Sequence, residues 1–205
     1  MASSRRRLFG LDRSGPRPSA TRRGEPLRPL TLPNLVGYLR LCGIPVFLYL
    51  ALSSDDGRTV ATAILYVAIS AGDYLDGFLA RATGQYSRMG ALLDPVIDRL
   101  TILAGIVVCW KFELLPRWAL AVLAARELVT LVLAQVALRR GVELEINWVG
   151  RWSVWLTMGG IFLALITDAW IAGAVFGVGL AGSLLASVLY LKVGIGEARR
   201  ADGDG

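Results

Sequence analysis

The chain has 205 residues, of which 55% are hydrophobic, and its mean hydropathy is +0.55. A water-soluble domain of this size carries a larger polar share, so the composition excludes an ordinary soluble globular protein. The formal net charge is +6, and the sequence contains no histidine. Any proton transfer must therefore fall to carboxylates, lysine, tyrosine or water.

The first thirty residues form a basic segment of low hydrophobicity. Eight of the 22 basic residues lie before residue 30, interspersed with Pro, Ser and Gly. The segment has no apolar stretch of a signal peptide and does not resemble a nucleic-acid-binding domain. We expect residues 1–30 to be a disordered cytoplasmic tail, which either contacts anionic lipid headgroups or only sets the topology.

Apolar runs of membrane-spanning length fill most of the remaining chain. A span needs about 20 mostly apolar residues. The runs are Leu35–Leu52, Val60–Leu79, Met89–Trp110, Pro116–Leu138, Val149–Ile166 and Trp170–Val193. The sequence therefore predicts an all-α integral membrane bundle of six transmembrane helices over residues 31–193, followed by a short polar tail at 194–205.

Charge placement predicts the orientation of this bundle. Six spans put both termini on one side, and the basic N-terminal segment assigns that side to the cytoplasm. The connectors predicted to lie outside hold only Arg58, Lys111 and Arg117 as basic residues. We expect an integral protein of a bacterial plasma membrane with cytoplasmic N- and C-termini.

Four aspartates interrupt the second and third apolar runs: Asp73, Asp76, Asp94 and Asp98. A carboxylate inside a bilayer costs about 3 kcal/mol or more unless it is paired, metal-bound or solvated. Helical spacing places each pair on one face, and both pairs lie near the cytoplasmic ends of antiparallel neighbours. Converging carboxylates repel one another, and one or two hard cations such as Mg²⁺ or Mn²⁺ would relieve that repulsion. The pattern predicts a metal site near the cytoplasmic face.

Small residues share the face of these acids: Gly77, Ala80 and Gly90. They either allow close helix packing or leave space for a flat nucleotide, and the neighbouring acids favour the second interpretation. Arg81, at the mouth of the site, is placed to pair with a phosphate. The alternative for Arg81 is an ordinary arginine that extends toward the cytoplasm.

The stretch from Asp73 to Asp98 reads D-x2-D-G-x2-A-R-x8-G-x3-D-x3-D without a gap. It resembles the signature of the CDP-alcohol phosphotransferase family. The resemblance implies a transferase for phospholipid synthesis, in which an acceptor hydroxyl attacks the lipid-bearing phosphorus of CDP-diacylglycerol and CMP leaves. It implies that Asp73, Asp76 and Asp94 bind metal, and that Asp98 binds metal and also serves as the base.

The resemblance also implies contacts to the CDP moiety. These contacts are Gly77, Arg81, Ser87 and Gly90, with Asn34 reaching the pyrophosphate.

The start of the first run, Thr31-Leu32-Pro33-Asn34, resembles the glycerol-acceptor branch of the family. Phosphatidylglycerophosphate synthases of that branch usually carry Asp-Lys at the end of the signature and Gly-Lys-x-Lys-Thr before the fifth span. Here the sequence reads Asp98-Arg99 and Gly150-Arg151. The missing lysines favour phosphatidylglycerol, the acceptor of the cardiolipin synthases, over glycerol 3-phosphate.

Two arginines near the fourth and fifth spans are candidates for binding the acceptor. They are Arg126 and Arg151. An arginine within a span is a functional candidate by default. Arg126 could equally pair with its neighbour Glu127.

A small transporter or channel whose acids line an ion path is the alternative class of protein. That interpretation leaves Arg81, the small residues and the uninterrupted signature unexplained. The family resemblance further suggests a homodimer, and small residues in the last run would permit close helix contact. They are Gly173, Gly177, Gly179 and Gly182.

Overall fold

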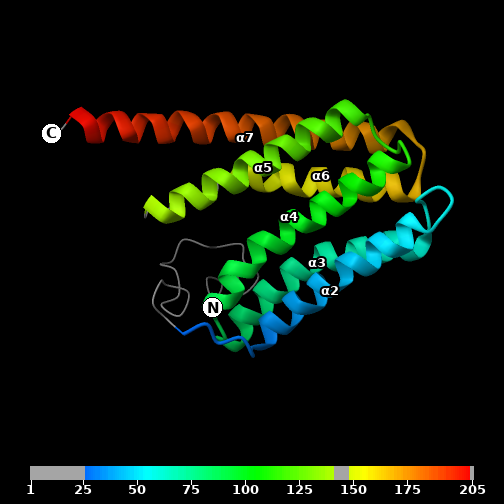
Figure 1. Cartoon of the computed structure of the whole chain (residues 1–205), viewed down its shortest axis with the longest axis horizontal. Coiled ribbons are helices and arrows are strands. Elements are labelled where there is room, and N and C mark those ends of the chain that lie inside the picture. The colour runs from blue at the N-terminus through cyan, green and yellow to red at the C-terminus, as the bar shows by residue number, and fades with distance from the viewer. Residues whose placement is uncertain (1–25, 141–147, 204–205) are drawn as a thin grey trace, which may run out of the picture. The chain divides into compact units, whose positions relative to one another are not determined.

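The computed structural model is helical throughout most of the residues that it describes, 26–140 and 148–203 (Figure 1). The helices are α2 (Leu32–Leu52), α3 (Val60–Thr83), α4 (Arg88–Lys111), α5 (Arg117–Arg140), α6 (Trp148–Ile166) and α7 (Trp170–Gly203). Each predicted apolar run corresponds to one of them, which confirms the all-α fold class. Side chains are described for residues 26–132 and 150–189, so residues 1–25 of the predicted tail lie outside the description.

Local sequence signals set the ends of α2 and α3. Thr31 caps α2, where its hydroxyl accepts a hydrogen bond from the Asn34 N–H. Thr59 and Thr62 form a reciprocal capping box at the start of α3. Gly84 ends α3 with a φ of 67°, a left-handed conformation that glycine adopts at little cost.

Three described helices are long and apolar enough to cross a membrane: Leu32–Leu52, Val60–Thr83 and Trp170–Leu189. The apolar stretch of α6, Gly150–Ile166, is shorter. In α4 the run is interrupted by Asp94, Asp98 and Arg99, and the described side chains of α5 end at residue 132. Length and composition therefore support three of the six predicted spans.

The last helix is longer than the predicted span. It continues through Gly203, across most of the stretch expected to be a polar tail. No proline interrupts the sequence there, and Glu197, Ala198 and Arg199 favour helix.

The chain divides into two compact units, Met1–Gly105 and Ile106–Gly205. In the first unit α2 and α3 lie side by side (Figure 1). Their contact buries Phe47 and Tyr66, whose ring centroids are 5.3 Å apart. The start of α4 joins this unit, where Ile97 is fully buried and faces the glycine backbone of Gly37.

In the second unit α6 packs tightly against α7 through small residues. A Cβ atom added to Gly160 would lie 2.6 Å from the Phe176 backbone, and one added to Gly179 would lie 2.5 Å from the Thr157 nitrogen. A Cβ atom added to Gly182 would lie 2.5 Å from the side-chain oxygen of Ser153. Close backbone approach of this kind is how helices associate in a membrane.

The adjacent residues Gly159 and Gly160 provide a test of this packing. Gly160→Ala forces Phe176 away from α6, and we expect it to destabilise the protein by about 1–3 kcal/mol. Gly159→Ala is the matched control, because a Cβ there meets nothing within 4 Å. Thermal unfolding in detergent should show a lowered Tm for Gly160→Ala alone. Equal Tm values for the two variants would contradict the tight α6–α7 contact.

Candidate active site

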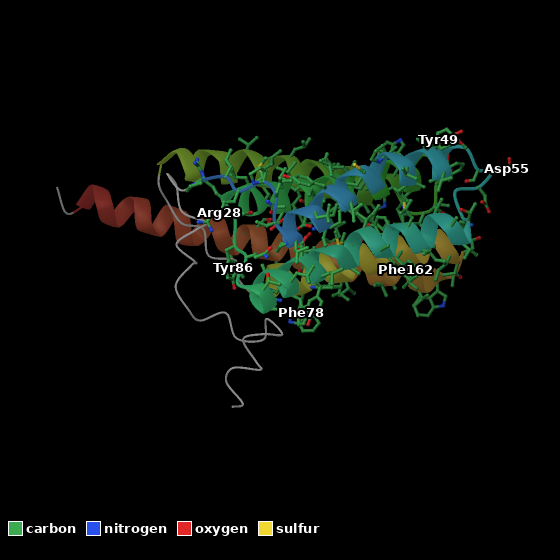
Figure 2. The ribbon with its side chains drawn as sticks, turned by 90° about the horizontal axis from the view of Figure 1, so that it is seen from below. Arg28, Tyr49, Asp55, Phe78, Tyr86 and Phe162 are labelled. Carbon is green, nitrogen blue, oxygen red and sulfur yellow. The ribbon has the colours of Figure 1, made fainter. Side chains whose placement is uncertain are left out.

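One end of the first unit gathers the start of α2, the end of α3 and the start of α4. Arg28 and Tyr86 lie at this end, and Tyr49 and Asp55 lie at the other (Figure 2). Two hydrogen bonds tie the start of α2 and the residues before it to the α3–α4 turn and the start of α4. The Met89 N–H donates to the Leu27 carbonyl at 3.1 Å, and the Leu32 N–H donates to Gln85 Oε1 at 3.1 Å.

Asn34 and Ser87 connect α2 to α4 at this end. The Ser87 hydroxyl donates to Asn34 Oδ1 at 2.8 Å and accepts from the Gly90 N–H at 2.9 Å. Ser87 is therefore the N-cap of α4 as well as a side-chain partner of α2. The Asn34 amide donates to the carbonyls of Arg28 and Pro29 at 3.0 and 3.1 Å.

A cavity of about 180 Å³ opens beside this network. All the residues predicted to contact the CDP moiety line it: Asn34, Gly77, Arg81, Ser87 and Gly90. Gln85 and Tyr86 line it too, and the signature did not single them out because they lie in its variable stretch.

The two glycines of the cavity wall are crowded by polar side chains. A Cβ added to Gly77 would lie 3.2 Å from Arg81 Nη1, so the Arg81 guanidinium folds back over Gly77. A Cβ added to Gly90 would lie 2.8 Å from Asn34 Oδ1. Larger residues at either position would push these hydrogen-bonding groups out of place.

The four acids differ in their position around the cavity. Asp76 and Asp94 line it, and the Asp76 side chain is buried. The side chains of Asp73 and Asp98 are 48% and 32% exposed and lie outside the cavity wall.

Arg40 of α2 joins three of these acids. Its guanidinium donates to Asp76 Oδ2 at 3.0 Å and to Asp98 Oδ1 at 2.6 Å, and it lies 3.8 Å from Asp73 Oδ1. No role for Arg40 was predicted from the sequence. A lone cation within an otherwise apolar 21-residue helix was the signal that could have found it.

The donor chemistry of the acids suits a hard divalent cation, because carboxylate oxygens are the ligands that Mg²⁺ and Mn²⁺ prefer. Among the described residues, however, no three acidic, cysteine or histidine side chains already converge as a metal-binding group. The predicted convergence is thus incomplete in this structure, where the Arg40 guanidinium lies among the acids. Arg40 bonds one oxygen each of Asp76 and Asp98, so the two carboxylates still offer their other oxygens to a metal.

The two acceptor candidates lie in the second unit. Arg126 Nη1 donates to Glu127 Oε1, and Arg126 Nε donates to the Ser187 hydroxyl at 3.3 Å. The Glu127 side chain is 2% exposed, which makes this a buried ion pair. Arg126 therefore pairs with Glu127, which is one of the two interpretations that the sequence left open. Arg151 is partly exposed near the start of α6.

Apolar helices are typical of a helical membrane protein, and a cavity lined by acids, an arginine and glycines has the lining that suits a phosphate-bearing ligand. A family model confirms the class that the signature predicted. The chain belongs to the CDP-alcohol phosphatidyltransferase family, whose model matches residues 30–189. Members of this family are enzymes and generally depend on a divalent metal. The chain is therefore an enzyme of this family, which leaves the transporter alternative without support.

Curated relatives carry two activities. The chain is 40% identical over 177 residues to a cardiolipin synthase (CMP-forming) of Streptomyces coelicolor. The aligned region covers 82% of this chain and 81% of the relative. It is 30% identical over 136 residues to a CDP-diacylglycerol–glycerol-3-phosphate 3-phosphatidyltransferase of Bacillus subtilis, covering 60% and 70%. A Sodalis glossinidius protein with that second name is 30% identical over 169 residues, covering 78% and 88%.

Ser87 has two roles, because it caps α4 and also lines the cavity. A substitution compared with a matched control can separate its effect on stability from its effect on substrate binding. Ser87→Ala removes the α4 cap and the bond to Asn34, and we expect it to destabilise the protein by about 1 kcal/mol. It should also raise the KM for CDP-diacylglycerol several-fold. Thr59→Ala removes the α3 cap at the far end of the same unit and is the matched control.

Thermal unfolding and CMP-release kinetics of the two variants check this expectation. Both variants should lose stability, and only Ser87→Ala should change the KM. An equal KM for both would remove Ser87 from the substrate site.

Proposed function

We propose that this enzyme transfers the phosphatidyl group of CDP-diacylglycerol to a hydroxyl of phosphatidylglycerol, as a CMP-forming cardiolipin synthase. The similarity to the Streptomyces coelicolor protein carries this choice of acceptor, because it is higher and covers more of the chain than the similarity to the Bacillus subtilis protein. Arginine in place of lysine at Arg99 and Arg151 supports the same choice. Glycerol 3-phosphate is the second candidate, supported by the relatives with that activity.

The CDP headgroup is proposed to occupy the cavity at the end of the first unit. Arg81 supplies a guanidinium that can bind a phosphate through two parallel hydrogen bonds. Asn34 and Ser87 supply an amide and a hydroxyl held by their mutual bond. Gly77 and Gly90 leave room for the Arg81 guanidinium and the Asn34 amide at the cavity wall.

The four aspartates are proposed to hold two divalent metal ions, either Mg²⁺ or Mn²⁺, at the edge of this cavity. Asp73, Asp76 and Asp94 act as ligands, and Asp98 acts as ligand and base. A bound divalent cation supplies charge neutralisation for the phosphate oxygens and the leaving group. The oxygen-only character of the donors supports this assignment.

The proposed transfer is a single displacement at phosphorus. The acceptor hydroxyl oxygen forms a bond to the phosphorus that carries the diacylglycerol, and the bond from that phosphorus to the CMP oxygen breaks. The hydroxyl proton passes to the Asp98 carboxylate, whose 32% exposure leaves it accessible to the acceptor. CMP leaves with the electron pair of the broken bond.

Membrane placement and assembly are part of the proposal. Six membrane-spanning helices with cytoplasmic termini would place the cavity near the cytoplasmic face, since α2 begins and α3 ends beside it. A homodimer is proposed through the open glycines of α7. Gly173 and Gly177 line a groove of about 220 Å³ in the second unit, whereas Gly179 and Gly182 pack within the chain.

The acceptor is tested by CMP release from CDP-diacylglycerol with Mg²⁺ and one acceptor at a time. We expect turnover with phosphatidylglycerol and at least about tenfold less with glycerol 3-phosphate, a difference in transition-state binding of about 1.4 kcal/mol. Mass spectrometry of the lipid product should show cardiolipin. Turnover with glycerol 3-phosphate alone would assign the other activity. No CMP with either acceptor would contradict both proposed acceptors.

The metal and the base are tested together by chelation and substitution. EDTA should abolish CMP release, and excess Mg²⁺ or Mn²⁺ should restore it. Asp98→Asn keeps the shape of the side chain but removes the proton acceptor, so we expect kcat to fall at least about 100-fold. Asp55→Asn, at the opposite end of the unit, is the control and should keep full activity (Figure 2). Full activity of Asp98→Asn would exclude the proposed base.

A further inference from the structure

The three nitrogens of the Arg40 guanidinium each donate a hydrogen bond within the protein. Its side chain is 3% exposed, and its Nε donates to the Ile69 carbonyl of α3 at 2.9 Å. Its two terminal nitrogens each donate to a different aspartate, Asp76 on α3 and Asp98 on α4. One side chain of α2 therefore connects both helices that carry the acids.

The backbone of α3 is shaped to admit this arginine. A Cβ added to Gly72 would lie 2.5 Å from Arg40 Cδ and 2.7 Å from Arg40 Cγ. Even an alanine would therefore collide with the arginine stem. A buried guanidinium is costly unless it is hydrogen-bonded and paired, and here the aspartates and the Ile69 carbonyl meet that need.

Arg40 reaches the acids from outside the cavity. The cavity wall includes its partner Asp76 and also Asp94, but not Arg40 itself. Arg40 uses Oδ2 of Asp76 and Oδ1 of Asp98, one oxygen of each carboxylate. The arginine and the cavity therefore approach Asp76 from different directions.

The charges of the cluster also indicate that Arg40 supports the metal ligands and does not replace the metal. The four carboxylates of Asp73, Asp76, Asp94 and Asp98 outnumber the single Arg40 guanidinium that lies among them. One guanidinium is therefore too little charge to balance the cluster, and a divalent cation remains favourable beside it.

We propose that Arg40, seated against Gly72, is a positioning residue that holds Asp76 and Asp98 in the orientation in which they bind the catalytic metal. This role rests on the proposed metal site. Groups that hydrogen-bond metal ligands from behind fix ligand orientation, and their removal typically weakens metal affinity by about 10–100-fold. A competitor for the same site would act in the opposite direction, because its removal would strengthen metal binding.

The test is direct Mn²⁺ binding to the purified full chain in detergent, without lipid substrate, measured by electron paramagnetic resonance of free Mn²⁺. Arg40→Lys keeps the charge but loses the planar fork that bonds two carboxylates at once. Gly72→Ala keeps Arg40 and displaces it. Gly37→Ala is the matched control on α2, because a Cβ there makes an ordinary 3.6 Å contact with Ile97. Thermal unfolding and size-exclusion chromatography verify that each variant is folded.

We expect the Mn²⁺ Kd to rise by about 10–100-fold in Arg40→Lys and Gly72→Ala, and to stay within about threefold in Gly37→Ala. Unchanged or tighter binding in folded Gly72→Ala or Arg40→Lys would overturn the positioning role while the metal site stands. A native protein that binds no Mn²⁺ would overturn the metal site and this role together. If one variant fails to fold, the other decides by the same criterion.

Discussion

The structure of the first unit depends on one buried arginine paired with acids from two helices. An isolated carboxylate or guanidinium within apolar helices is strongly disfavoured unless it is paired. The bonds from Arg40 to Asp76 and Asp98 meet that constraint, and they fix α2, α3 and the start of α4 at one relative register. The cavity that opens beside Asp76 exists only if these three elements keep that register.

Glycines make room for neighbouring groups in both units, but the groups that they admit differ. In the first unit, Gly72 admits the stem of Arg40, and Gly90 admits the amide of Asn34. Both glycines therefore serve polar side chains that act at or beside the cavity. In the second unit, Gly160 and Gly179 admit the backbone of the partner helix, which favours close helix packing. The number of glycines in a helix does not distinguish these roles. They are distinguished by the atoms that lie where the Cβ of a larger residue would be.

The sequence predicted the helices and much of the cavity, because both follow from local spacing. Apolar runs match the six helices, and the cavity residues Gly77, Arg81, Ser87 and Gly90 come from one continuous motif. The bond between Arg40 and Asp98 joins residues 58 apart, and no local period encodes the register of α2 against α4. The full length of α7 was missed because hydropathy marks the end of a span and does not mark the end of a helix.

We propose that the acid-lined cavity binds CDP-diacylglycerol through a metal held by the aspartates. An anomalous-difference map from crystals grown with Mn²⁺ and CMP would show this binding. We expect Mn²⁺ peaks at coordination distance, about 2 Å, from carboxylate oxygens of Asp76 and Asp94, with the CMP phosphate beside Arg81. CMP bound elsewhere, or bound in the cavity with Mn²⁺ on other residues, would contradict it.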